Sequence, residues 1–170
     1  MLAHFHVLLL FLLVCGSAFG ETSDNLCKNK EEVLFSCHTG KKIISVCASI
    51  PVTAHSGYVQ YRFGKKNAIE LVYPSSLLPP YDHFFQRRER YATATSYTHL
   101  RFKNGKHSYI VYHEVSSSMG TDGRRTIDEN AGVSVIDHHG KRLYLECNDS
   151  DKSELSFDEE IFQQDDDVER

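Results

Sequence analysis

The dipeptide Asn104-Gly105 constrains the fold most, because stretches that alternate between two sets of side chains flank it on both sides. A tight type I′ hairpin turn needs φ > 0 at both central residues, which Asn and Gly adopt most easily. A two-residue turn centred here pairs Lys103 with Lys106 and predicts one face for the core and one mixed face toward water. The core face carries Thr98, Leu100, Phe102, Tyr109, Val111 and Val115, and the mixed face carries Tyr97, His99, Arg101, Ile110, Tyr112 and Glu114.

The N-terminus has the pattern of an export signal. Residues 7–14 form an apolar run that is too short to span a bilayer, and Ala18 and Gly20 occupy the −3 and −1 positions of a cleavage site before Glu21. We therefore expect residues 1–20 to be a signal peptide and the mature chain to be periplasmic or secreted, with no membrane span. Lipidation of Cys15 is the alternative to simple cleavage.

Removal of this signal leaves four cysteines, an even number in an oxidising compartment. Two disulfides are expected, and the count alone allows three connectivities. In a closed barrel the first strand pairs with the last, which favours Cys37–Cys147. A turn on Thr39-Gly40 places Glu32 opposite Cys47, so the segment that leads from Cys27 passes near it, which favours Cys27–Cys47.

After Cys27 the chain alternates short apolar-rich runs with turns. This pattern predicts one all-β domain over residues 21–148, an antiparallel eight-stranded barrel or sandwich in meander order that the disulfides staple. The third and fourth strands are expected to pair with Arg62 opposite Glu70. The predicted strands are residues 32–37, 42–48, 57–63, 69–73, 97–103, 106–115, 132–137 and 141–147.

Three segments read as irregular. Residues 74–90 contain prolines that exclude a central strand, with a helical turn or two expected over 83–90, and residues 116–131 form a polar, Gly-containing loop. Residues 149–170 hold 10 Asp and Glu against 2 Lys and Arg, which predicts an acidic, disordered tail. The alternative for the tail is one short docking turn built on Leu155, Phe157, Ile161 and Phe162.

Sequence motifs for catalysis are missing. There is no Gly-x-Ser-x-Gly or Ser-x-x-Lys, the cysteines can all pair, and no histidines have helical metal-ligand spacing. We expect no enzyme, no metal and no cofactor, and the net acidic chain argues against a nucleic-acid partner. Two alternatives stay open, a small-ligand carrier and an exported hydrolase. Large inward aromatics such as Tyr61, Phe63 and Phe102 would oppose the carrier, and the hydrolase would use Asp82, His83, Glu89 and His113.

An exported, disulfide-linked, eight-stranded meander with cysteines in its first and last strands resembles the periplasmic inhibitors of C-type lysozyme. The local match is Arg90-Tyr91, an aromatic strand that ends at Phe102-Lys103, and Gly105, while Gln86 to Glu89 replace a Ser-Gly of the family. The resemblance implies a small barrel that pushes a polar loop into an enzyme cleft. We therefore expect a binding protein that inhibits a cell-wall-degrading enzyme, or a related immunity protein that neutralises a toxin. Candidate contacts are Arg90, Tyr91, Ser96, Lys103 and Lys106.

The tight turns of the predicted meander are rich in cations. If these turns share one end of the barrel, they form a basic rim that would attract an acidic protein partner, with Lys65 and Lys66 as further candidate contacts. The alternative is that lysine simply keeps turns soluble and unpaired. The rim would consist of Lys41, Lys42, Lys65, Lys66, Lys103, Lys106, Lys141 and Arg142.

Overall fold

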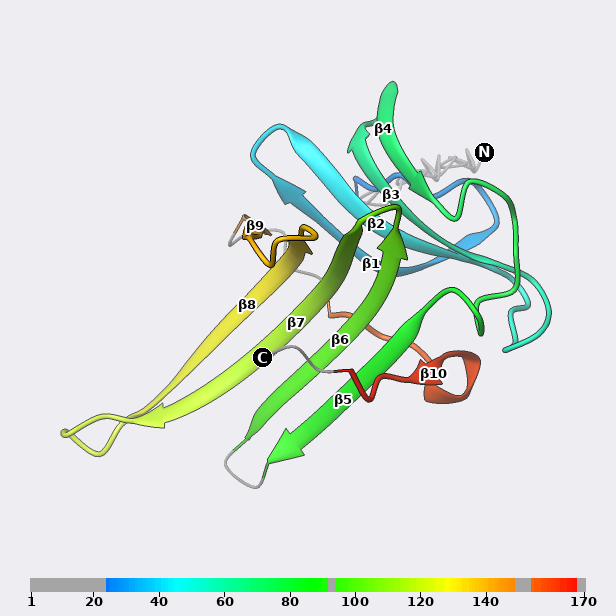
Figure 1. The fold of residues 1–170 in the computed structure, drawn as a ribbon. Helices are drawn as coiled ribbons and strands as arrows, with labels where there is room; N and C mark the ends of the chain where they lie inside the picture. Colours follow the sequence, from blue (N-terminus) through cyan, green and yellow to red (C-terminus); the bar gives the residue numbers. More distant parts are fainter. Residues whose placement is uncertain (1–23, 92–93, 149–153, 168–170) are drawn as a thin grey trace, which may run out of the picture.

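The computed structural model describes residues 24–91, 94–148 and 154–167, and in this part the chain is all-β, with ten strands in two sheets (Figure 1). The predicted signal segment lies outside the described residues. The strands are β1 (Glu31–Thr39), β2 (Lys42–Ser49), β3 (Val59–Lys65), β4 (Ala68–Tyr73), β5 (Phe85–Tyr91), β6 (Thr95–Asn104), β7 (His107–Met119), β8 (Arg125–Ile136), β9 (Arg142–Glu146) and β10 (Gln163–Gln164), and the 3₁₀ turn η2 (Glu159–Ile161) precedes β10.

The two sheets pack as an open sandwich. One sheet has the order β1-β2-β3-β4 and the other the order β10-β5-β6-β7-β8-β9. Every pairing is antiparallel except that of β10 with β5. The expected closed barrel of eight strands is wrong, because β1 and β9 form no ladder among the described residues. The free edge of β1 is satisfied instead by Asn148 N, 2.8 Å from His38 O, and by Ser156 N, 3.0 Å from Leu34 O.

Aromatic rings fill the space between the sheets. The Phe102 side chain is fully buried, and its ring centroid lies 4.4 Å from that of Tyr73, 4.9 Å from Tyr109 and 5.0 Å from Tyr61. These rings come from β3, β4, β6 and β7, so they join the two sheets. The interior is thereby occupied by the protein's own side chains, which disfavours the small-ligand carrier.

The hairpin of β6 and β7 confirms the predicted faces and corrects the predicted pairing. Gly105, with φ 59°, and Lys106 form the turn, and Lys103 lies opposite Ser108 rather than Lys106. Because the pairing moves by two positions, every side chain keeps its face. Leu100 and Val111 on the predicted core face are fully buried.

Two predicted irregular segments are in fact strands. Residues 85–91, within the segment for which a helical turn was expected, form β5, and most of the expected loop 116–131 belongs to β7 and β8, which stay paired as far as Met119 and Arg125. Both faces of these stretches carry polar residues, so the alternation that reveals a half-buried strand is weak. Pairing with neighbouring strands, rather than local sequence, sets their conformation.

The β3–β4 hairpin also differs from the sequence prediction. A two-residue turn at Lys66-Asn67 and a bulge between Phe63 and Gly64 each displace the ladder by one position, so Arg62 lies opposite Val72 instead of Glu70. Arg62 is freed from the surface pair and becomes one of the most buried large side chains of the molecule.

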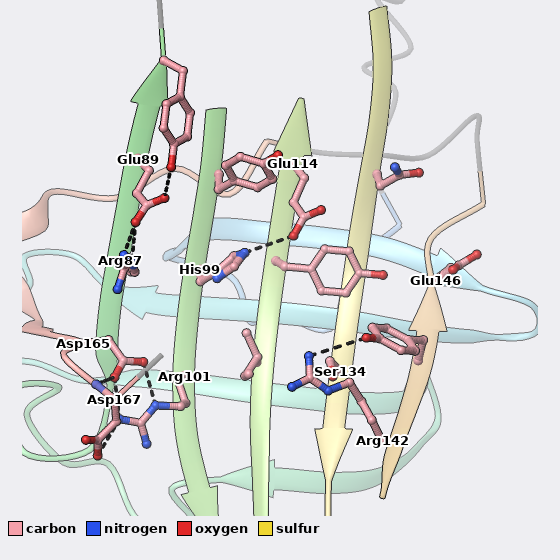
Figure 2. Close-up of a pocket in the computed structure, with 16 residues that line it drawn as sticks. Arg87, Glu89, His99, Arg101, Glu114, Ser134, Arg142, Glu146, Asp165 and Asp167 are labelled. Carbon is pink, nitrogen blue, oxygen red and sulfur yellow. Dashed lines mark hydrogen bonds and ion pairs between the residues drawn. The ribbon is translucent and has the colours of Figure 1, made fainter. Parts of the chain in front are cut away.

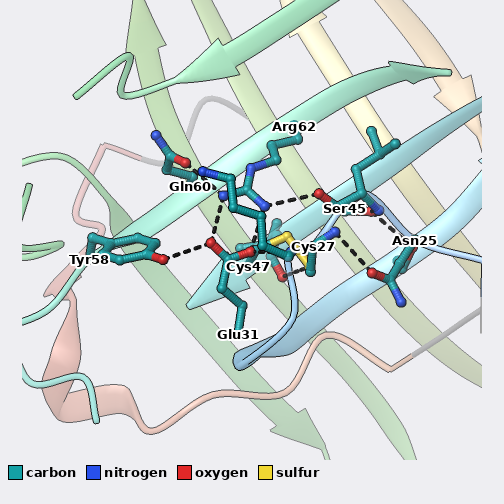
Figure 3. A network of polar contacts seen from close by, with 12 residues as sticks. Asn25, Cys27, Glu31, Ser45, Cys47, Tyr58, Gln60 and Arg62 are labelled. Atoms are coloured by element: carbon teal, nitrogen blue, oxygen red, sulfur yellow. Dashed lines mark hydrogen bonds and ion pairs between the residues drawn. A yellow bond between two sulfur atoms is a disulfide. The ribbon is translucent and has the colours of Figure 1, made fainter. Parts of the chain in front are cut away.

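The N-terminal segment, residues 24–30, covers the outer face of the four-stranded sheet (Figure 3). Leu26 N donates to Ser45 Oγ at 3.0 Å, and Arg62 donates to Leu26 O at 2.9 Å. The Arg62 guanidinium also meets both oxygens of Glu31, at 2.6 and 2.8 Å, and each of these two side chains is 2% exposed. A polar network is thus buried beneath a strap of backbone.

Both disulfides have the favoured connectivity. Cys27–Cys47 pins the N-terminal segment to β2, and Cys37–Cys147 ties β1 to the end of β9. Two disulfides are consistent with an oxidising compartment.

The expectation of a disordered tail is wrong for residues 154–167. Leu155, Phe157, Ile161 and Phe162 are buried in the core between the sheets, and β10 extends the six-stranded sheet at the edge of β5. The alternative, a short docking turn built on these four residues, is the one that the structure shows, because burial of their apolar side chains outweighs the cost of ordering an acidic segment. Figure 1 shows this segment in orange and red.

Candidate functional site

The outer face of the six-stranded sheet is hollowed into a groove of about 630 Å³ (Figure 2). Its sixteen lining residues come from β5 to β9 and from the C-terminal segment. Six of them are the residues of the mixed face that the sequence predicted to point toward water. Alternation of side chains along each strand separates this lining from the core.

The strand register arranges the lining into rows that cross the sheet. The central row runs through Arg87, His99, Tyr112, Gly132 and Glu146, one residue from each successive strand. Cross-strand neighbours lie about 5 Å apart, so a row of five spans roughly 20 Å. The groove is therefore long enough for an extended partner surface.

The rows on either side differ in chemistry. Toward the β5–β6 turn, the adjacent row contains Glu89, Tyr97, Glu114 and Asn130. On the other side, the row contains Arg101, Ile110, Ser134 and Tyr144. An acidic row thus lies on one side of the central row, and a row with an apolar centre lies on the other, four residues away along each strand.

Gly132 makes room at the middle of the groove. Its φ is +157°, and a Cβ there would meet the Leu145 carbonyl oxygen at 2.3 Å and Tyr112 Oη at 3.1 Å. Only glycine fits this approach, and it lets the tyrosine ring lie across β8. The Tyr112 side chain is held in place as part of the groove floor.

Ion pairs and hydrogen bonds fix the polar side-chain groups on β5, β6 and β7 (Figure 2). Arg87 Nε donates to Glu89 Oε1 at 2.6 Å, and Tyr91 Oη donates to the other oxygen of Glu89 at 2.5 Å. His99 Nε2 lies 3.2 Å from Glu114 Oε1. These side chains reach the solvent with their geometry already set, which lowers the entropy cost of binding.

Arg101 anchors the end of the groove. Its guanidinium donates to both carboxylate oxygens of Asp165 at 2.6 Å, and both side chains are buried. The face of the guanidinium lies 4.8 Å from the Phe85 ring centroid. A carboxylate from the C-terminal segment is thus built into the site.

Tyr112 stays a neutral hydrogen-bonding group. Burial first, and then the negative charges of Glu146 and Glu114, raise the pKa of its hydroxyl to about 12. Nearby, the buried Ser134 Oγ has no hydrogen-bond partner in the described part of the chain. Tyr112 Oη is therefore the hydroxyl that lies near two carboxylates, whereas Ser134 Oγ is shielded from solvent.

The groove continues into a second cavity of about 420 Å³. Arg101, Ile110 and Asp167 line both cavities, and Lys103 lines only the second. Across the main groove, five carboxylates face three arginines, so its charge is negative when His99 is neutral. A basic surface is the electrostatic complement of this face.

The structure separates the binding residues predicted from sequence. Tyr91 and Lys103 belong to the grooved face, but they stand at opposite ends of the sheet. Arg90 lies opposite Ser96 on the other face of the sheet, next to the β5–β6 turn. Ser96 and Lys103 are about 23 Å apart at the usual rise along a strand.

The predicted basic rim is divided between the sheets and partly neutralised. Lys65 and Lys66 belong to the four-stranded sheet, and Lys66 Nζ lies 3.0 Å from Asp24 Oδ1. Lys42 Nζ lies 2.7 Å from Glu70 Oε2. Lys106 stands at the β6–β7 turn, and a shared docking role for these cations stays a prediction.

The residues proposed for a hydrolase do not share one surface. Glu89 faces the groove, whereas His113 lies on the opposite face of the same sheet with Nε2 2.6 Å from Glu129 Oε1. Asp82 and His83 belong to the connection between β4 and β5. A donor cluster of Cys27, Glu31 and Cys47 also exists, but the disulfide occupies both sulfur atoms.

Sequence reasoning missed the groove as a site because its residues come from five strands and the C-terminal segment. The signal within reach was the mixed face of the β6–β7 hairpin, which carries Tyr97, Arg101 and Tyr112 without an apolar stripe. Arg87 and Glu89 could not be added, since β5 was not predicted as a strand.

Comparison of this chain with protein-family models, with curated proteins and with solved structures finds no match. Within residues 24–91, 94–148 and 154–167, no helix has the length and apolar character needed to cross a membrane.

Proposed function

We propose that this chain is an exported binding protein that captures a partner protein on the grooved face of its six-stranded sheet. The observation that carries the proposal is the composition of the groove, with four tyrosines and three arginines among its sixteen lining residues. Tyr and Arg are the side chains most enriched at the energetic centres of protein interfaces.

The exposure of the groove tyrosines fits this role. Tyr91 and Tyr144 are 52% and 53% exposed, whereas Tyr112 is 8% exposed and forms the floor. A partner would therefore bury two large rings at the rim against a floor that does not move. Tyrosine contributes much contact area with few rotatable bonds, so little entropy is lost when it is covered.

The charge of the groove indicates the partner's chemistry. Glu114 and Glu146 both line the groove and both raise the pKa of the Tyr112 hydroxyl, so a Lys or Arg of the partner would meet negative charge beside this tyrosine. Such a contact would be charge-assisted on both sides and would also lie against the ring. The proposed partner thus offers a basic, convex surface.

The partner we propose is an enzyme that the complex inhibits, in first place one that degrades the cell wall, and a delivered toxin in second place. The two disulfides support this choice, because they fit the oxidising compartment in which such enzymes act. Because the grooved face is concave, it would block the enzyme by covering a projecting basic rim of the active site.

Three forms of the purified chain test the proposal: the wild type, the groove variant Glu114→Lys/Glu146→Lys, and the control Glu32→Lys/Glu160→Lys. The control reverses two exposed carboxylates outside the groove. Each form is used to capture proteins from a periplasmic or secreted extract, and the captured protein is then purified and titrated.

We expect a 1:1 complex with wild type and control alike, at least about tenfold weaker binding by the groove variant, and loss of the partner's activity in proportion to occupancy. Equal binding by the groove variant would contradict the assignment of the site. Full activity of the bound partner would contradict inhibition.

A further inference from the structure

The C-terminal segment, residues 154–167, bridges the free edges of the two sheets. Ser156 N donates to Leu34 O at the edge of β1, and Asp165 N donates to Gln86 O at the edge of β5, at 3.0 and 2.7 Å. Gln163 lies opposite Phe85 in the parallel ladder of β10 and β5. The segment takes the place that a closing strand would have in a barrel.

Its apolar anchors point into the seam between the sheets. Leu155 is fully buried and Phe162 is 3% exposed. The Phe162 ring centroid lies 5.0 Å from that of Phe157, within the segment, and 5.9 Å from that of Phe84, just before β5. Burial of four large apolar side chains holds the segment more firmly than the few hydrogen bonds of a two-residue strand can.

Two arginines outside the segment, on β5 and β6, form ion pairs with its acidic residues. Arg101 holds Asp165 in a buried, two-pronged pair. Arg88 donates to Glu159 Oε1 at 3.1 Å, and its guanidinium lies 5.0 Å from the Phe157 ring centroid. Docking of the segment thus depends on both its apolar and its acidic residues.

These contacts have the form of peptide recognition by strand addition, in which backbone hydrogen bonds at a sheet edge give affinity and side-chain pockets give specificity. The hydrogen-bond, ion-pair and ring partners of the segment lie far away in the sequence, at residues 34, 82–88 and 101. None of the contacts requires a covalent link between the segment and the body.

We propose that the seam between β1 and β5 is a binding site for extended acidic peptides. The chain's own residues 154–167 are its resident ligand, and a partner segment with the pattern Leu-x-Phe-x-x-x-Ile-Phe-x-x-Asp competes with them. The proposal goes beyond the capture of a protein on the grooved face. If a partner segment replaced residues 154–167, Asp165 and Asp167 would leave the groove. Arg101 would then pair with a carboxylate of the partner segment.

The probe is a fluorescent synthetic peptide with the sequence of residues 154–167, added to the full-length chain. The resident segment is first weakened by Asp165→Asn in the chain, which removes one charge of the buried pair. Glu160→Gln is the matched control, since Glu160 is exposed and its side chain makes no hydrogen bond or ion pair within the described part of the chain. Binding is followed by fluorescence anisotropy, and circular dichroism confirms that all forms are folded.

We expect saturable 1:1 binding, with an apparent Kd at least tenfold lower for the Asp165→Asn chain than for the wild type and Glu160→Gln chains. A peptide that carries Asp165→Asn itself should bind at least tenfold more weakly. Failure of the peptide to bind any form, or indifference to Asp165 in the peptide, would overturn the proposal.

A nicked form keeps the test decisive if Asp165→Asn unfolds the chain. A protease site placed within residues 149–153 is cut after folding, so all of the chain is retained. The labelled peptide should then replace the cut segment, and the unlabelled peptide should reverse the exchange. A cut segment that never exchanges under native conditions would overturn the proposal. Because none of these measurements involves a protein partner, they can fail while the proposed function holds, and the reverse is also true.

Discussion

The outer faces of the two sheets each carry an arginine–carboxylate pair, which is buried on one face and open to solvent on the other. On the four-stranded sheet, the Arg62–Glu31 pair lies beneath the N-terminal segment, and both side chains are 2% exposed. On the six-stranded sheet, Arg87 and Glu89 are 28% and 30% exposed and line an open groove. An arginine–carboxylate pair therefore does not by itself indicate a structural or a binding role. Whether another segment covers the pair decides whether it supports the fold or is open to a partner.

The physical difference between the faces is desolvation. A covered pair has lost its water, so each partner depends on the other, and removal of one leaves a buried charge unpaired. An open pair keeps much of its hydration and contributes about 0–1 kcal/mol to folding. Its hydrogen-bonding groups can be offered to another molecule at little cost to the fold.

The largest effect is expected when the covered pair is broken. The substitution Arg62→Met keeps much of the side-chain volume but leaves the Glu31 carboxylate buried without its guanidinium. We expect the free energy of unfolding to fall by about 3–5 kcal/mol. Urea denaturation at pH 7 measures this, and a loss below about 1 kcal/mol would show that water reaches Glu31.

A second prediction uses pH to reach the same pair without removing Arg62. Burial opposes ionisation of Glu31, but hydrogen bonds from Arg62, Lys28 N and Tyr58, with the charge of Arg62, outweigh it and lower the pKa from 4.5 to about 2. A lowered folded-state pKa stabilises the fold above the unfolded value, and this stabilisation is lost as pH falls.

The shift corresponds to stabilisation on the order of 3 kcal/mol, which should be lost between about pH 4.5 and pH 2. The stability difference between wild type and Glu31→Gln should therefore be largest at pH 7 and should shrink across this window. Thermal or urea unfolding at a series of pH values gives this difference. A difference that stays constant down to pH 2 would mean that the Glu31 pKa is not lowered.

The covered face was partly within reach of sequence reasoning. The even cysteine count and the turn at Thr39-Gly40 led to Cys27–Cys47, the disulfide on this face. Cys37–Cys147 was also predicted correctly, although from a pairing of first and last strands that the structure does not have. The burial of Arg62 was not within reach, because it follows from the N-terminal segment that folds over it and supplies Leu26 O and Glu31 as its partners. The predicted pair with Glu70 was also wrong, since the ladder is displaced by two positions, and a bulge of this kind depends on tertiary packing.

The open face was less accessible to prediction. Alternation around Asn104 correctly separated core from surface on β6 and β7. It could not show that β5, with three arginines in seven residues, adds a strand beside them, or that Asp165 returns from the end of the chain to Arg101. These features depend on residues far apart in sequence, and local composition pointed the other way in both cases.

The smallest effect on stability is expected from the matched substitution in the open face, Arg87→Met. Like Arg62→Met, it removes a guanidinium, but here from a pair with Glu89 that stays partly hydrated. Glu89 also keeps the hydrogen bond from Tyr91 Oη, so the carboxylate is not left without a donor. We expect the free energy of unfolding to change by no more than about 1 kcal/mol.

The salt dependence sharpens the contrast between the two substitutions. Contributions from open pairs are screened, whereas covered pairs are screened much less. The small cost of Arg87→Met should therefore fade when urea denaturation is repeated in 1 M NaCl, and the larger cost of Arg62→Met should persist. If Arg87→Met instead cost several kcal/mol at both salt concentrations, the pairs of the groove would be part of the structural framework. The grooved face would then have no polar groups to spare for a partner, because their binding capacity would already be committed to the fold.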